Sequence, residues 1–248
     1  MGPRDRAWAP PPAWHDSRVA WGEVRSGRAL DRLLNFSDAV VAVAITILAL
    51  PLVDIAGPSE GDSMIDVLRA HLGEIQTFVV TFIVVGILWG VHNRIVNVLR
   101  AYDSAIFWLS LLWLMGFVFM PWPSSLYDGS SFSALRAEEF QPGSNGAGVL
   151  YWLTVAYISL IGALTAWHIS RHPDLVDPSQ RAYWKASRSG GAQYRGIAFT
   201  AVFVIAAVAT YFVYSLGNLC LLLFIPIAIF LKPARVNTEA FSAEGPLP

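Results

Sequence analysis

The residue whose chemistry stands out is Asp38, the one charged residue in a stretch from 33 to 53. An ionised aspartate deep in a membrane span costs roughly 2.5–3.5 kcal/mol, so it should face protein or water and have a partner. If the residue lies near the lipid headgroups instead, Ser37 and Asp38 would complement the positive end of a helix dipole. In the first arrangement, Asp38 and His92 could also relay protons. The sequence leaves both positions open.

A second chemical pattern is the pair His168 and His172, which lie four residues apart and would share one face of a helix. Two such imidazoles could share a metal ion. Membrane di-iron enzymes carry several boxes of this kind, whereas this chain has five histidines in all. The pattern therefore favours a solvated pair at a membrane surface, and we expect no cofactor. No H-E-x-x-H, G-x-S-x-G or P-loop pattern occurs, so we predict no enzyme activity.

The composition indicates the class of protein that must position these residues. The 248 residues are 55% hydrophobic and only 14% charged, whereas a typical soluble domain has about 25% charged residues. These proportions predict a polytopic membrane protein. A net charge of -1 argues against a nucleic-acid partner. The single cysteine, Cys220, excludes an intramolecular disulfide.

Runs without charge locate the expected spans and predict an all-α membrane domain over residues 28–232. The longest run, 196–231, would be about 54 Å long as one helix, but the hydrocarbon core is only about 30 Å thick. We therefore expect two spans there, folded at the turn-prone residues 215–218. The six predicted spans are approximately 32–55, 64–98, 102–122, 147–170, 195–215 and 217–231.

The charge distribution predicts the orientation. If six spans follow an inside amino terminus, 15 of the 17 lysines and arginines lie inside, and only Arg69 and Arg136 lie outside. This bias is the positive-inside rule, and it places the tails 1–27 and 233–248 in the cytoplasm. The first 31 residues contain no apolar stretch typical of a cleavable signal. Eight acids on the outside would attract cations, although acids are tolerated on either side.

Two motifs resemble those of a known family. Residues 32–38 read R-x-x-x-F-S-D at the start of the first span, and residues 89–94 read W-G-V-H-N-R in the second. These segments resemble the signature and the W-x-x-H-H-R element of the endosomal and lysosomal potassium-channel family called transmembrane protein 175, which has prokaryotic relatives. The resemblance covers about residues 28–127. Asn93 replaces the second histidine, and Ser110 stands where an asparagine is expected.

The resemblance implies a fold and a function. In this family the first helices of the subunits surround the pore, and prokaryotic members are six-span subunits that assemble as symmetric tetramers. Val43 matches the constricting apolar position, Thr46 matches a threonine layer implicated in potassium selectivity, and Ile47 and Leu50 match further pore-lining positions. The only bound metal implied is permeant potassium near Thr46. Because no T-V-G-Y-G filter occurs, any selectivity must come from side chains.

Helix geometry separates two faces of the first span. At 100° per residue, Ala39, Val43, Thr46, Ile47 and Leu50 form one stripe, and Ser37 and Asp38 lie on the other side. The stripe is either pore-lining or an ordinary packing seam. Signature residues would fix the helix through a polar network, in which we expect a buried clamp within one subunit. The network residues are Arg32, Phe36, Ser37, Asp38, Trp89 and His92, of which the last four form the clamp. Arg32 could instead anchor the helix at the headgroups or act on the pore mouth.

The sequence thus predicts a homotetrameric, potassium-preferring channel with apolar rings as a gate, in a bacterial plasma membrane. Lipid is the other expected partner, with no nucleic acid and no small-molecule substrate. The alternatives are a proton-coupled transporter or proton-leak pathway that uses Asp38 and His92, and a membrane enzyme that uses His168 and His172. We also expect Asp103 to be solvated or paired with Arg100.

Overall fold

The computed structural model describes residues 24–55, 57, 63–127, 146–182, 184 and 192–212. Most of these residues are helical. The predicted turn at 215–218, the sixth span at 217–231, the carboxyl-terminal tail and most of the amino-terminal tail lie outside the described residues. The helices are α1 (Arg28–Ile47), α2 (Leu50–Val53), α3 (Met64–Ala70), α4 (Leu72–Val96), α5 (Ser104–Phe119), α6 (Pro121–Leu126), α7 (Gly146–Arg171) and α9 (Ala192–Phe212).

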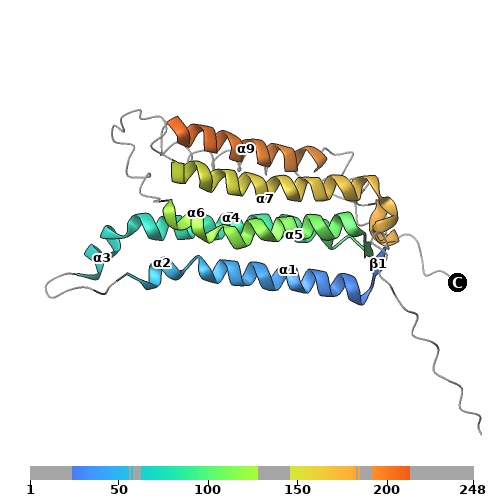
Figure 1. Ribbon diagram of the computed structural model, residues 1–248, viewed down its shortest axis with the longest axis horizontal. Coiled ribbons are helices and arrows are strands. Elements are labelled where there is room, and N and C mark those ends of the chain that lie inside the picture. Colours follow the sequence, from blue (N-terminus) through green and yellow to red (C-terminus); the bar gives the residue numbers. More distant parts are fainter. Residues whose placement is uncertain are drawn as a thin grey trace, which may run out of the picture.

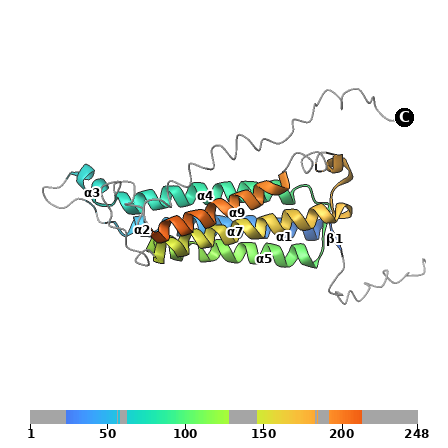
Figure 2. The same cartoon turned by 90° about the horizontal axis from the view of Figure 1, so that it is seen from above.

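The long helices lie side by side in layers (Figure 1). α1 forms one outer layer, α7 and α9 form the opposite one, and α4 and α5 lie between them. Seen from above, α4 and α5 run along opposite edges of the bundle (Figure 2). α7 packs along α9 and α5, and α5 also packs along α1. α1 therefore contacts the bundle from one side only.

Four helical stretches are long and apolar enough to cross a membrane, namely Arg28–Val53, Leu72–Val96, Ser104–Leu126 and Gly146–Arg171. They confirm the predicted helical class, and each overlaps one of the first four predicted spans. The fifth predicted span coincides with α9, whose apolar part, Gly196–Phe212, is shorter. The described residues therefore account for five of the six predicted helices.

Three of these spans are interrupted. The first breaks after Ile47, because Pro51 has no N–H to donate to the Ile47 carbonyl, and α2 begins at Leu50. The third breaks at Met120, where Pro121 starts α6. The predicted span 64–98 is wrong as a single helix, since His71 has φ −110° and ψ 23° and separates α3 from α4. α3 starts with its own capping box, in which Ser63 and Asp66 bond to each other's backbone N–H.

The main core lies where the layers meet. α1 contributes a narrow face with the spacing of one helical stripe, which includes Val41, Ala44 and Leu48. α4 adds Thr81, whose hydroxyl lies 3.1 Å from the Tyr151 hydroxyl of α7. Large aromatic side chains fill the remaining space between α5, α7 and α9. The fully buried ones are Trp113, Phe117, Tyr151, Trp152 and Phe203.

A small sheet closes one end of the bundle, which we call the sheet end. β1 (Arg25–Ser26) pairs antiparallel with β2 (Ala101–Tyr102). The exit from α7 joins them, because the Arg100 N–H donates to the Leu175 carbonyl at 2.9 Å and the Asp177 N–H donates to the Val98 carbonyl at 2.9 Å. Gly27, with φ 60°, turns the chain from β1 into α1. The sheet end therefore ties the start of α1 to the α4–α5 connection and to α7.

The contact between α7 and α9 generates a packing prediction. A Cβ at Gly196 would lie 2.7 Å from the Ala163 Cβ and 3.2 Å from the Ala163 Cα, neither of which can rotate away. We expect Gly196→Ala to push the helices apart at a cost of about 1–3 kcal/mol. The thermal unfolding midpoint in detergent should fall by about 2–12 °C. Gly162→Ala is the matched control, since its Cβ would meet only Trp113 Nε1, at 3.9 Å. Equal midpoints for both variants would contradict the prediction.

Candidate functional site

The predicted stripe on α1 is an exposed surface of the protomer. Ala39, Val43, Thr46, Ile47 and Leu50 are all exposed, and Val43 and Leu50 each retain 57% of their accessible surface. The opposite side of the helix is the narrow buried face that packs on α5 and α4. Among the residues that the structure describes, no helix packs on the stripe, so there it could face a pore or another subunit.

Thr46 is the polar member of this exposed stripe. Its hydroxyl donates a hydrogen bond of 2.7 Å to the Val43 carbonyl one turn earlier. A threonine hydroxyl has one proton to donate and two lone pairs that can accept. Because the proton is held by the helix itself, the oxygen presents lone pairs to whatever approaches the stripe. This chemistry suits a cation or a water molecule.

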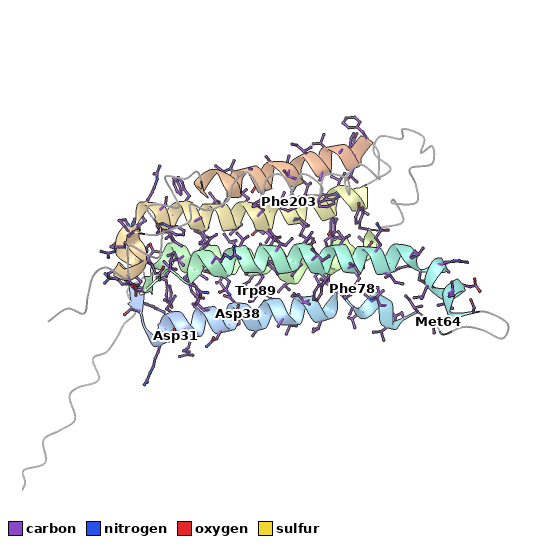
Figure 3. The ribbon with its side chains drawn as sticks, turned by 180° about the vertical axis from the view of Figure 1, so that it is seen from behind. Asp31, Asp38, Met64, Phe78, Trp89 and Phe203 are labelled. Carbon is purple, nitrogen blue, oxygen red and sulfur yellow. The ribbon has the colours of Figure 1, made fainter. Side chains whose placement is uncertain are left out.

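Asp38 and Trp89 join α1 to α4. The Trp89 Nε1–H donates to Asp38 Oδ1 at 2.8 Å, and Figure 3 shows both side chains in the space between the two helices. Asp38 is thereby paired with another helix of its own chain. Both residues are exposed rather than buried. The bond therefore lies at the edge of the α1–α4 contact.

Ser37 and His92 do not take part in this contact. The Ser37 hydroxyl is buried and donates to the Leu33 carbonyl of its own helix at 2.9 Å. His92 is 4% exposed and stacks on Trp113 of α5, with ring centroids 3.8 Å apart. Positions three apart on a helix differ in direction by about 60°, so Trp89 can face α1 while His92 faces α5. The predicted clamp is thus reduced to the Asp38–Trp89 pair.

The other signature residues lie nearby without joining the pair. Arg32 and Phe36 are exposed on α1. The two departures from the family pattern bond within their own helices. Asn93 Oδ1 accepts from Asn97 Nδ2 at 2.8 Å, and the Ser110 hydroxyl donates to the Ile106 carbonyl at 2.8 Å. Neither substitution therefore disturbs the contact between Asp38 and Trp89.

A polar cluster that the sequence did not predict lies at the sheet end. His168 Nε2 lies 2.8 Å from Asp103 Oδ2, and the two side chains are only 17% and 23% exposed. The prediction of a solvated histidine pair is therefore wrong for His168. Asp103 does not pair with Arg100, whose Nε donates instead to the Asp174 carbonyl at 2.9 Å. No local pattern could reveal a contact between residues 65 positions apart.

The carboxylate of Asp103 has a second task at the start of α5, where Oδ1 accepts the Ile106 N–H at 2.9 Å. Burial opposes the ionisation of Asp103, but the bonds from Ile106 and His168 and the nearby charges of His168 and His172 outweigh it. The pKa of Asp103 is therefore lower than usual. Among the described residues, no three His, Cys, Asp or Glu side chains are grouped as metal ligands.

These observations define a polytopic helical membrane protein whose first span is half uncovered and pinned by an aspartate. The sequence profile described as the endosomal/lysosomal potassium channel TMEM175 matches residues 32–121, which contain both motifs and the Asp38–Trp89 pair. A potassium channel of Streptomyces collinus is 32% identical over 149 residues, which is 59% of this chain and 68% of that protein. The chain belongs to the TMEM175 channel family.

Two further comparisons extend this result. The human endosomal/lysosomal proton channel TMEM175 is 26% identical over 156 residues, which is 62% of this chain but only 29% of the human protein. The crystal structure of a lysosomal potassium-selective channel TMEM175 homolog from Chamaesiphon minutus is similar with a TM-score of 0.61 and 21% identity. The match covers 83% of this chain and all of that chain. The likeness establishes the channel fold.

The Asp38–Trp89 bond generates a testable prediction. Trp89→Phe keeps the ring but removes the donor, so we expect a loss of roughly 1–3 kcal/mol in folding stability for a bond to a charged group. Asp38→Ala should cost a similar amount, and the double variant should cost little more than either single variant. Unfolding in detergent measures all three. Trp122→Phe is the control, since Trp122 is an exposed tryptophan on α6. Additive single effects would refute the coupling.

Proposed function

We propose that this chain is one subunit of a homotetrameric channel that prefers potassium and conducts through a central pore lined by α1. The observation that carries the proposal is the uncovered stripe on α1. Around its middle the exposed side chains are small, as at Ala39, Ala42 and Val43, whereas α5 exposes Trp108, Met115 and Phe119. Small side chains let helices approach closely around an axis, and bulky ones suit contact with lipid.

Apolar rings would form the gate of this pore. Four symmetry-related copies of Val43, Ile47 and Leu50 would stack along the axis at successive turns of the helix. Narrow apolar rings resist wetting and block ions without a moving plug. Val43 is smaller than the isoleucine or leucine usual at this position in the family, so this ring would be the weaker barrier.

The Thr46 layer would aid selectivity. Its hydroxyl proton is bound to the Val43 carbonyl, which leaves oxygen lone pairs directed away from the helix. Four such oxygens could replace part of the hydration shell of a potassium ion. The Asp38–Trp89 bond would keep α1 at a fixed rotation, and so would keep Thr46 directed at the axis.

Charge supports an orientation with both termini in the cytoplasm of a bacterial cell. Apart from Arg69 in α3, the arginines of the described residues lie towards the sheet end, for example Arg28, Arg100 and Arg171, whereas Asp54 and Glu74 lie towards α3. The positive-inside rule then assigns the sheet end to the cytoplasm. Acids at the opposite end would raise the local cation concentration.

Proton conduction is the second candidate, because the human relative carries the name proton channel. A relay through Asp38 and His92 receives less support. Within the described residues no hydrogen bond joins the two side chains, and His92 stacks on Trp113 instead. A proton path along the same pore would need a water chain past the apolar rings.

A flux measurement tests the proposed function. Full-length protein reconstituted into vesicles with a potassium gradient should dissipate that gradient passively, and a pH-sensitive dye inside the vesicles should report much less proton flux. Protein-free vesicles are the control. Vesicles that contain folded protein but move protons and no potassium would favour the second candidate. Vesicles that move neither ion would overturn the channel proposal.

Thr46→Ala tests the selectivity layer. We expect this variant to conduct with a lower preference for potassium over sodium, because its four hydroxyl oxygens are lost from the pore. Thr46→Ser keeps the hydroxyl and is the matched control, which should retain most of the preference. Reversal potentials under potassium/sodium bi-ionic conditions measure both variants. An unchanged reversal potential in Thr46→Ala would show that the layer does not select.

A further inference from the structure

The polar cluster at the sheet end joins two helices that begin and end there. Asp103 precedes α5 and caps it through the Ile106 N–H, while its other oxygen contacts His168 Nε2 at 2.8 Å on the last turns of α7. The His172 ring lies one turn further, with its centroid 4.4 Å from that of His168. One carboxylate and two imidazoles therefore meet at the junction of α5 and α7.

This junction is connected to the start of α1. Tyr102, next to Asp103, pairs with Arg25 in the small sheet, and Gly27 then leads directly into α1. On the other side, Leu99 and Val176 form a bridge between the α4–α5 connection and the segment after α7. A change in how tightly Asp103 holds α7 therefore acts on the segment from which α1 starts.

The neighbouring charged groups are mostly engaged with other partners. The Arg171 guanidinium lies over the Trp167 ring at 4.1 Å, and Arg100 donates to the Asp174 carbonyl. Asp177 bonds to Ser179, and the charges that act on it are those of Arg100 and Arg181. The charges that act on Asp103 are those of His168 and His172. His168 and His172 are therefore the charged neighbours that act on the Asp103 carboxylate.

We propose that Asp103, His168 and His172 form a proton-sensitive clasp between α5 and α7 that tunes the channel from its sheet end. Histidine is the side chain whose charge ordinarily changes near neutral pH. A protonated His168 forms an ion pair with Asp103 in place of a bond between a neutral ring and a carboxylate, and bonds to charged partners are the stronger ones. The contact between His168 and Asp103 therefore strengthens as the pH falls towards 6. A positive charge on His172 would repel the one on His168 and so limit the increase.

The direction of the pH effect depends on which group of the clasp changes charge, the carboxylate or the imidazoles. The pKa of Asp103 is lower in the folded protein than that of an ordinary aspartate, so its own contribution is lost only as the pH falls through that lower value. Between pH 6 and pH 8 the carboxylate is ionised in the folded and unfolded chains alike. A pH response of the clasp in this window therefore cannot come from Asp103 itself.

Thermal unfolding of the full chain in detergent tests the clasp independently of conduction. His168→Gln can still donate to Asp103 but cannot take up a proton. Relative to this variant, the wild-type unfolding midpoint should rise by about 2–4 °C when the pH is lowered from 8 to 6. Asp103→Asn keeps a good capping residue and should also lose this response. His71→Gln, at an exposed pair with Glu74 near α3, should keep it. Parallel midpoints in wild type and His168→Gln would overturn the proposal.

Potassium flux at symmetric pH tests the regulatory part, which rests on the proposed function. Wild-type flux should change by about fivefold or more between pH 6 and pH 8, and His168→Gln should conduct with little pH dependence. If wild-type flux is independent of pH, or if His168→Gln keeps the full response, the clasp does not regulate the pore. An absence of flux in every variant would count against the channel itself, and the unfolding comparison would then decide the clasp.

Discussion

α1 is held to the described part of the chain by a narrow strip of its surface, because the other helices described leave the rest of it uncovered. Val41, Ala44 and Leu48 supply the apolar part of that strip. Apolar packing alone resists rotation of a helix only weakly when lipid is as apolar as the core. The hydrogen bond from Trp89 to Asp38 adds a directional contact, and β1 fixes the amino-terminal end of the helix. These attachments let the stripe with Thr46 stay exposed.

The two ends of the bundle differ in how they are built. At the sheet end, backbone hydrogen bonds join the entry to α1, the α4–α5 connection and the exit from α7. At the other end, the first span is interrupted between α1 and α2, which contains Pro51, and α3 carries exposed apolar residues such as Met64 and Leu68. Because the first span is anchored at the sheet end and interrupted near the opposite end, its part next to α3 can move while the attachment at the sheet end is kept. This asymmetry would suit a pore whose apolar rings lie between the Asp38 contact and the end of the bundle next to α3.

The family relationship and the geometry constrain the function together. Relatives carry the names of a potassium channel and of proton channels, so the name alone does not decide the ion. The arrangement on α1 favours a pore with one polar layer, since Thr46 is the hydroxyl-bearing member of the stripe. Two titratable groups that do lie close together, Asp103 and His168, are at the sheet end rather than on the stripe. Permeation and proton sensing would then occupy separate places.

The sequence by itself determined the membrane class, the approximate position of the first four spans, the stripe on α1 and the family, because hydropathy, helical period and short motifs are local properties. Only the tertiary structure decided which side of α1 is covered and that Trp89 rather than His92 meets Asp38. It also decided the break at His71 and the contact of Asp103 with His168 across 65 positions. A helical period fixes the angles between residues on one helix. How each helix is rotated against its neighbours depends on packing between distant segments, which no local pattern encodes.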